Sequence, residues 1–138
     1  MSDMNDFNTK VIAEFRGNEG RVGGPFEGAS MLLLHSTGAK SGSERVHPLV
    51  YRPEGTTYVI FASKAGAPDN PAWYHNLKAH PVASIEVGTS TIAVTAREAE
   101  GEERDRLWAA QKSDVPQFGE YEASTTRIIP VVVLEPTG

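Results

Sequence analysis

The sequence of 138 residues contains no cysteine, so disulfides, zinc–thiolate sites and thiol nucleophiles are excluded. Long apolar runs are also missing, since the two most apolar stretches cover only residues 31–34 and 128–134, whereas a transmembrane helix needs about 20 residues. Positive charge is scarce as well: 13 Lys and Arg stand against 18 Asp and Glu, a net charge of −5. This balance argues against a general nucleic-acid binder, which needs a basic surface.

The first ten residues have neither the basic start nor the apolar segment of a signal peptide. Together with the lack of cysteine, this predicts a protein of the cytoplasm. The remaining composition, 39% hydrophobic and 22% charged, is typical of a globular fold. We therefore expect a single domain over residues 1–138, in which residues 1–28 form a helix and a glycine-rich crossing.

Hydrophobic periodicity and turn residues predict a helix, three strands, a helix, two strands, a helix and a last strand. The expected helices cover residues 3–16, 71–79 and 101–112, and the expected strands cover 31–36, 45–51, 57–61, 82–87, 91–96 and 127–134. Turns are expected at 37–42 and 53–55, a loop around Pro116 and Gly119, and a helix cap at Asn70. Six antiparallel strands with short turns favour an α+β, mainly β fold, built as a closed or nearly closed barrel with flanking helices.

The expected turn at residues 37–42 combines features that suit an anion. Glycines such as Gly42 let the backbone turn tightly and present N–H groups, while Lys40 and Arg45 add positive charge. The segment is not a P-loop, because the GK[ST] spacing is absent and a strand follows. The alternative is an ordinary hairpin turn with solvated charges, and composition alone favours that interpretation.

A second segment, residues 61–76, leads from a strand through small residues into a helix. Small residues let a flat ring approach the backbone, and a helix N-terminus favours negative charge. The alternative is a connector in which Trp73 simply belongs to the core. The histidines have no i, i+4 spacing, so no metal site is predicted. His47, in a strand next to the expected pocket, is a candidate polar contact to a ligand.

Four stretches resemble a known family: LLLHSTGAKSGSERVHPLVY, FASKAGAPDNPAWYHNLKAHP, GEERDRLW and RIIPVVVLEP. They are similar to the deazaflavin-dependent nitroreductases of actinobacteria, within the split β-barrel flavin and deazaflavin oxidoreductases. The resemblance extends from about Met31 to the C-terminus. It implies a split β-barrel enzyme in which reduced deazaflavin, coenzyme F-420, is the hydride donor.

The resemblance also implies site residues. The groups that bind the anionic tail of the coenzyme correspond to Lys40, Arg45 and Lys64. The contacts to its ring correspond to loop and barrel residues: Pro48, Ala62, Ser63, Ala65, Gly66 and Ala67, with Trp73 and Asn76 near the same groove. The coenzyme carries a phosphate and an acidic glutamyl tail, so two basic loops in an acidic protein are consistent with a local anion clamp.

The acceptor side departs from the nitro-activating relatives. Those relatives carry several tyrosines around the acceptor, where this chain has Val50, Val115 and Phe118 and keeps Tyr121. A more apolar pocket favours an enone, a quinone or another flat conjugated acceptor over a nitroimidazole. Tyr121 and Ser63 are the expected catalytic residues, because their hydroxyls can stabilise developing negative charge.

Two other functions remain open from the sequence. One is an FMN-dependent oxidoreductase of the same barrel type, and the other is a non-catalytic protein that binds deazaflavin or another amphipathic ligand. The expected partner is a small-molecule acceptor, with no nucleic acid and no integral membrane segment. A homodimer is one option, because related barrels often pair across open sheet edges.

Overall fold

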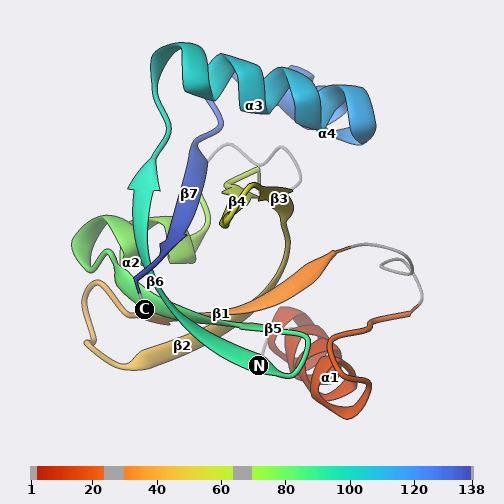
Figure 1. Cartoon of the computed structure of the whole chain (residues 1–138), viewed down its shortest axis with the longest axis vertical. Coiled ribbons are helices and arrows are strands. Elements are labelled where there is room, and N and C mark those ends of the chain that lie inside the picture. The colour runs from red at the N-terminus through yellow and green to blue at the C-terminus, as the bar shows by residue number, and fades with distance from the viewer. Residues whose placement is uncertain (1–2, 24–29, 64–69, 138) are drawn as a thin grey trace.

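The computed structural model describes residues 3–23, 30–63 and 70–137, and within them it shows four helices and seven strands (Figure 1). The helices are α1 (Asp3–Gly17), α2 (Ala72–Ala79), α3 (Gly101–Asp114) and α4 (Gln117–Ala123). The strands are β1 (Met31–Thr37), β2 (Glu44–Val50), β3 (Arg52–Glu54), β4 (Thr57–Phe61), β5 (Val82–Val87), β6 (Ser90–Glu98) and β7 (Val131–Pro136). No helix in these ranges has the length and apolar character needed to cross a membrane.

All seven strands form one antiparallel sheet in the order β2-β1-β5-β6-β7-β4-β3. The long strand β6 pairs with β5 along its first part and with β7 along its last part. The two edge strands, β2 and β3, are consecutive in the chain and are separated by Tyr51 alone. One extended stretch therefore supplies both edges, and the sheet curls into a split barrel. The predicted α+β split barrel is confirmed.

Alternation along the strands divides the apolar residues between the barrel interior and two outer layers. In β1, Leu32 and Leu34 face the interior cluster, whereas Met31 and Leu33 pack with α1. The helices α3 and α4 lie at the opposite end of the molecule from α1 (Figure 1). They cover a separate cluster that contains Trp108.

A charged cluster joins α1 to the sheet. Arg16 donates two hydrogen bonds to the carboxylate of Glu86 in β5, at 3.2 and 2.7 Å. His35 Nε2 lies 2.5 Å from the same carboxylate, and His35 Nδ1 lies 3.4 Å from Glu44 Oε2. The hydrogen bond from Arg16, with a smaller contribution from His35, holds the pKa of Glu86 below its ordinary value.

Two predicted boundaries were wrong. Residues 52–54 do not turn but pair with β4, and the turn follows at Gly55, whose φ of 61° suits glycine. The last strand begins at Val131 rather than at residue 127. Pro130 has no N–H to donate to a neighbouring strand, so regular pairing begins only after it. Its carbonyl still accepts a hydrogen bond from the N–H of Ala62 at 3.0 Å.

Two predictions of local structure were also wrong. The expected loop around Pro116 and Gly119 is the helix α4, because Phe118 packs against the cluster under α3 and outweighs the low helix propensity of glycine. Asn70 does not cap α2; the cap position is Pro71, and the Asn70 side chain instead accepts a hydrogen bond from Arg127.

The other expected helices and strands are confirmed to within a few residues. Residues 24–28 of the expected glycine-rich crossing lie outside the described ranges. The single-domain organisation over residues 1–138 stays a prediction.

We expect Glu86→Gln to lower the free energy of unfolding by about 1 kcal/mol at pH 7, the order of a charged hydrogen bond in a partly exposed pair. The pKa of Glu86 is lowered in the folded state, so its contribution is present above the ordinary value of 4.5. It is lost as the pH falls through the lowered value. Urea unfolding of both proteins at pH 7 and below pH 4 should show a difference that shrinks at low pH.

The matched control is Glu120→Gln, since Glu120 is exposed. A Glu86→Gln variant as stable as the wild type at pH 7 would show that the charged cluster does not hold α1 on the sheet.

Candidate functional site

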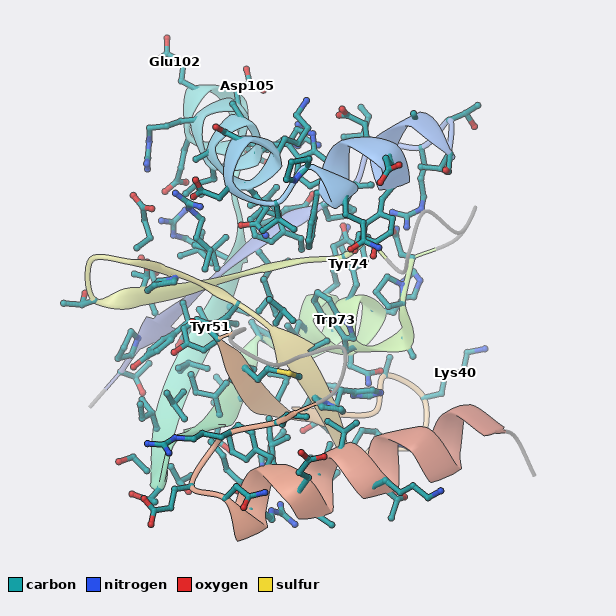
Figure 2. The ribbon with its side chains drawn as sticks, turned by 90° about the vertical axis from the view of Figure 1, so that its right-hand side faces the viewer. Lys40, Tyr51, Trp73, Tyr74, Glu102 and Asp105 are labelled. Atoms are coloured by element: carbon teal, nitrogen blue, oxygen red, sulfur yellow. The ribbon has the colours of Figure 1, made fainter. Side chains whose placement is uncertain are left out.

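A cavity of about 460 Å³ lies where the turn between β1 and β2 meets helix α2. The turn contributes residues 38–41, β2 contributes Arg45 and His47, and α2 contributes Ala72, His75 and Asn76. Helix α2 is distant in the sequence from the turn and β2 but lies beside them in the fold (Figure 1). Lys40 extends outward from the turn at the edge of the molecule (Figure 2).

The local structure of each element explains its contribution. Arg45 and His47 are two residues apart in β2 and therefore share one face of the strand. Ala72, His75 and Asn76 follow the i, i+3, i+4 spacing of one helix face. Because Ala72 is the first residue of α2, the positive end of the helix dipole lies at the cavity.

The turn is held together by its own hydrogen bonds. The N–H of Gly38 donates to the carbonyl of Ser43 at 2.8 Å, and the N–H of Gly42 donates to the carbonyl of Gly38 at 2.9 Å. A Cβ at Gly38 would lie 2.5 Å from Ser41 Oγ, so a larger residue here would displace the Ser41 hydroxyl, which accepts a hydrogen bond from the N–H of Ser43 at 3.2 Å. The N–H groups of Gly38 and Gly42, which were expected from the sequence to face a ligand, are therefore already bonded within the turn. Side-chain charge is then the main attraction for an anion at this turn.

Asn76 fastens the turn to α2. Its side chain is buried; Oδ1 accepts a hydrogen bond from the N–H of Ala39 at 3.0 Å, and Nδ2 donates to Ser36 Oγ at 3.3 Å. Ser36 is the buried residue of β1 directly before the end of that strand. Asn76 therefore lines the cavity and at the same time fixes the backbone from which Lys40 projects.

The described lining is positive, although the whole protein is acidic. It contains Lys40, Arg45 and two histidines, and no Asp or Glu. Glu44, next to Arg45 in the sequence, lies instead within 3.4 Å of His35, which packs on the other side of the strand pair. Such a separation of charge attracts anions to one place on an acidic surface.

His47 adds an unsatisfied polar group. Its Nδ1 is buried and has no hydrogen-bond partner among the residues that the structure describes. Burial, with a smaller effect from the charge of Arg45, lowers the pKa of His47. A buried polar atom without a partner is costly, so a ligand atom that pairs with this nitrogen would be favoured. In the described parts of the chain, no group of three His, Asp or Glu side chains is arranged to hold a metal ion.

The cavity brings together Lys40, Arg45 and Asn76 of the predicted cofactor-binding residues. Gly42 belongs to the same turn, with a φ of 70°, but not to the lining. By alternation, Pro48 lies on the face of β2 that carries Val46 and Val50, which pack towards α1. The ring of Pro48 is therefore turned away from the cavity.

Two further predicted contacts, Ala62 and Trp73, are buried in the barrel interior. Trp73 thus has the core position that the alternative interpretation expected, within the body of the molecule (Figure 2). The remaining predicted contacts lie outside the described residues: Lys64, Ala65, Gly66 and Ala67.

The two predicted catalytic residues do not line the cavity. Ser63 is buried and lies two residues after the end of β4, and Tyr121 lies in α4 rather than in a loop. The ring of Tyr121 packs on Phe118 at 5.3 Å between centroids, and Phe118 packs on Phe61 at 5.6 Å. Tyr121 therefore belongs to the aromatic cluster beside β4, two ring contacts away from the strand that ends just before Ser63.

The structural role of Arg127 was not predicted from the sequence. This side chain donates to Asn70 Oδ1 at 2.7 Å and to the carbonyl of Ser63 at 2.9 Å, and so joins the two residues that flank segment 64–69. The partners are 57 and 64 residues away in the sequence. No local pattern signals contacts over such a separation.

The family model of the F420H(2)-dependent quinone reductases matches residues 8–136. An F420H(2)-dependent quinone reductase of Mycobacterium tuberculosis (strain ATCC 25618 / H37Rv) is 44% identical over 126 residues, which is 88% of this chain and 85% of that protein. An F420-H2 dependent reductase of known structure has a TM-score of 0.70 and 42% identity, covering 77% of this chain and 94% of the other.

A chain solved as a domain-swapped dimer has a TM-score of 0.72 and 38% identity, covering 96% of this chain and 98% of the other. These likenesses confirm the predicted resemblance to deazaflavin-dependent reductases of the split-barrel type. This chain belongs to the F420H(2)-dependent quinone reductase family.

Proposed function

We propose that this protein is a reductase that transfers a hydride from reduced coenzyme F-420 to a quinone or another flat conjugated acceptor. The observation that carries the proposal is the cavity at Lys40 and Arg45, whose described lining holds no acidic side chain. Family membership supports the coenzyme and a quinone as acceptor. When bound, the reduced coenzyme supplies the hydride, and the protein supplies binding and orientation.

The cavity fits the acidic tail of this coenzyme. Lys40 comes from the turn and Arg45 from β2, so the positive charges approach a ligand from two elements. Such an arrangement suits an extended anion with a phosphate and several carboxylates better than the single terminal phosphate of FMN. The volume of about 460 Å³ lies within the range of about 300–1,000 Å³ common for ligand pockets.

We place the acceptor at the end of β4, beside the aromatic cluster. Ser63 lies two residues after the end of this strand, and the contacts from Phe61 through Phe118 to Tyr121 connect the strand to α4. A hydroxyl there can donate a hydrogen bond to an oxygen atom that gains negative charge. Ser63 and Tyr121 are thus proposed as acceptor-side residues. Lys64, Ala65, Gly66 and Ala67, which follow Ser63 in the sequence, remain proposed coenzyme contacts.

The first test compares electron donors. Quinone reduction is measured with reduced F-420, reduced FMN and NADPH at matched concentrations, and turnover is expressed per bound cofactor. Reduced F-420 should give the highest value, because only its tail matches both basic positions. Tightly bound FMN after purification, together with no turnover from reduced F-420, would favour the FMN enzyme instead.

Lys40→Ala and Arg45→Ala should each weaken binding of F-420 about tenfold, which corresponds to about 1.4 kcal/mol. The affinity of the wild type should also fall as salt rises, because exposed ion pairs are screened. The matched control is Lys78→Ala, since Lys78 lies in the last turn of α2 and lines a different cavity. Fluorescence titration measures the affinities; unchanged values in both variants would make the turn an ordinary hairpin with solvated charges.

Asn76→Ala should weaken binding of F-420 indirectly, because the N–H of Ala39 loses its acceptor and Lys40 loses its fixed position. We expect a loss of stability of about 1–3 kcal/mol for the buried partners left unpaired. The direct readout is hydrogen exchange of the Ala39 amide, which should become faster. Asn76→Asp keeps an acceptor and should restore part of the protection. Equal exchange in wild type and Asn76→Ala would exclude the positioning role.

Tyr121→Phe should slow quinone reduction about tenfold, the effect of losing one hydrogen bond of about 1.4 kcal/mol in the transition state. The affinity for F-420 should stay the same, because Tyr121 does not line the anion cavity. Turnover and titration are measured on the same preparations. A variant that loses stability but keeps its turnover would show that Tyr121 only packs the cluster.

A further inference from the structure

His47 lines the cavity, but the proposed function assigns it no role. In β2 the face that carries Arg45 and His47 continues to Leu49, which packs against the barrel interior. The cross-strand neighbour of His47 in β1 is Leu34, a member of the same interior cluster. His47 therefore lies at the boundary between the positive mouth of the cavity and the apolar interior.

The Nδ1 atom of His47 is buried and has no hydrogen-bond partner in the described part of the chain. The charged or titratable groups that line the cavity beside it are Lys40 from the turn, Arg45 from β2 and His75 from α2. None of these is a carboxylate, and Glu44 in the same strand pairs with His35. A ligand oxygen is thus the natural partner for this nitrogen.

We propose that His47 hydrogen-bonds the phosphate or a carboxylate of the coenzyme tail and takes up one proton from solvent when the tail binds. The inference rests on the proposed function, since it assumes an anionic ligand in this cavity. The proton adds to a ring nitrogen of a neutral imidazole, and no bond of the ligand breaks. His47 would then be a residue that makes affinity depend on pH.

The physical reason is a change in the field at the ring. Without a ligand, burial and the charge of Arg45 lower the pKa of His47, so the ring is neutral at pH 7. An anion between the ring and the two cationic side chains offsets the positive field and accepts the N–H, and both effects favour the imidazolium form. The pKa of His47 therefore rises when the anion binds.

The sign of the pH dependence follows by linkage. Affinity is constant above the pKa of the complex, increases as the pH falls between the two values, and is constant again below the pKa of the unliganded protein. One proton gives at most a tenfold change in affinity per pH unit. Lysine and arginine side chains ordinarily stay charged in this range, so contacts from such residues alone would leave the affinity independent of pH.

The test follows the imidazole Cε1–H resonances of isotope-labelled protein from pH 5 to pH 8.5, with and without saturating oxidised F-420. Calorimetry in buffers of different ionisation enthalpy counts the protons taken up. We expect the His47 resonance to titrate below the ordinary value of 6.5 in the unliganded protein and at a higher pH in the complex. His47→Asn should bind without proton uptake, whereas the control His80→Asn, at an exposed histidine at the end of α2 and outside the cavity lining, should keep it.

Outcomes other than the expected one also decide between this inference, its failure and the failure of the proposed function. A His47 resonance that does not move with F-420, or proton uptake that persists in His47→Asn, overturns the inference. If His47→Asn does not fold, the titration of the wild-type resonance alone still decides. If F-420 does not bind at any pH, the proposed function fails, and inorganic pyrophosphate and a triglutamate peptide are used as probes. A raised pKa of His47 with either probe supports the proton-linked anion site, and no shift with both rejects it.

Discussion

The register between β1 and β2 determines the charge of the cavity. The two strands pair over seven residues, from Met31 opposite Val50 to Thr37 opposite Glu44. In this register Arg45 and His47 line the cavity, while Val46 and Val50 pack towards α1. A slip by one residue would exchange the two faces. Glu44 and Val46 would then take the places of Arg45 and His47, and the cavity would lose positive charge on which the proposed binding of an anion depends.

The same strand pair separates positive from negative charge. On one side, Glu86 and Glu44 surround His35, with Arg16 bound to Glu86. On the other side, Lys40 and the other cavity residues form a lining without carboxylates among its described members. A protein with a net charge of −5 can thus hold an anionic ligand, because the thickness of the sheet and the apolar residues of both faces keep the two groups apart.

Local patterns were sufficient to predict most of the barrel. Strands β4 and β5 have the predicted bounds, because each lies between clear turn signals; β4 is a run of β-branched and aromatic residues, and β5 has an alternating apolar pattern on one face. Helix α4 and strand β3 were missed, since each depends on tertiary packing or pairing rather than on its own sequence. Asn70 has the residue type of a helix cap, but Arg127, distant in the sequence, binds its side chain.

The candidate site was predictable to a similar extent. The positive turn and Asn76 followed from the residues and the family resemblance, and the cavity brings them together. The resemblance identified sequence positions but not the face of the strand on which each side chain lies, so it could not show that Pro48 points away from the cavity. Nor could it show that the Asn76 side chain forms hydrogen bonds with Ala39 and Ser36. Strand alternation, applied to β2 alone, would have separated Pro48 from His47.

Arg127 connects the two halves of the proposed reaction. Its hydrogen bonds hold Ser63, which follows β4 on the proposed acceptor side, and Asn70, which lies two residues before Ala72 at the cavity. The chain between them spans only residues 64–69. Because one side chain holds both ends of this segment, Arg127 restricts the relative positions of the two proposed sites. Hydride transfer requires such restriction, since the reacting atoms must approach to about 3–3.5 Å. Thus, in the proposed reaction, a side chain outside the cavity lining can still limit how the coenzyme at Lys40 and Arg45 meets the acceptor proposed beside Ser63.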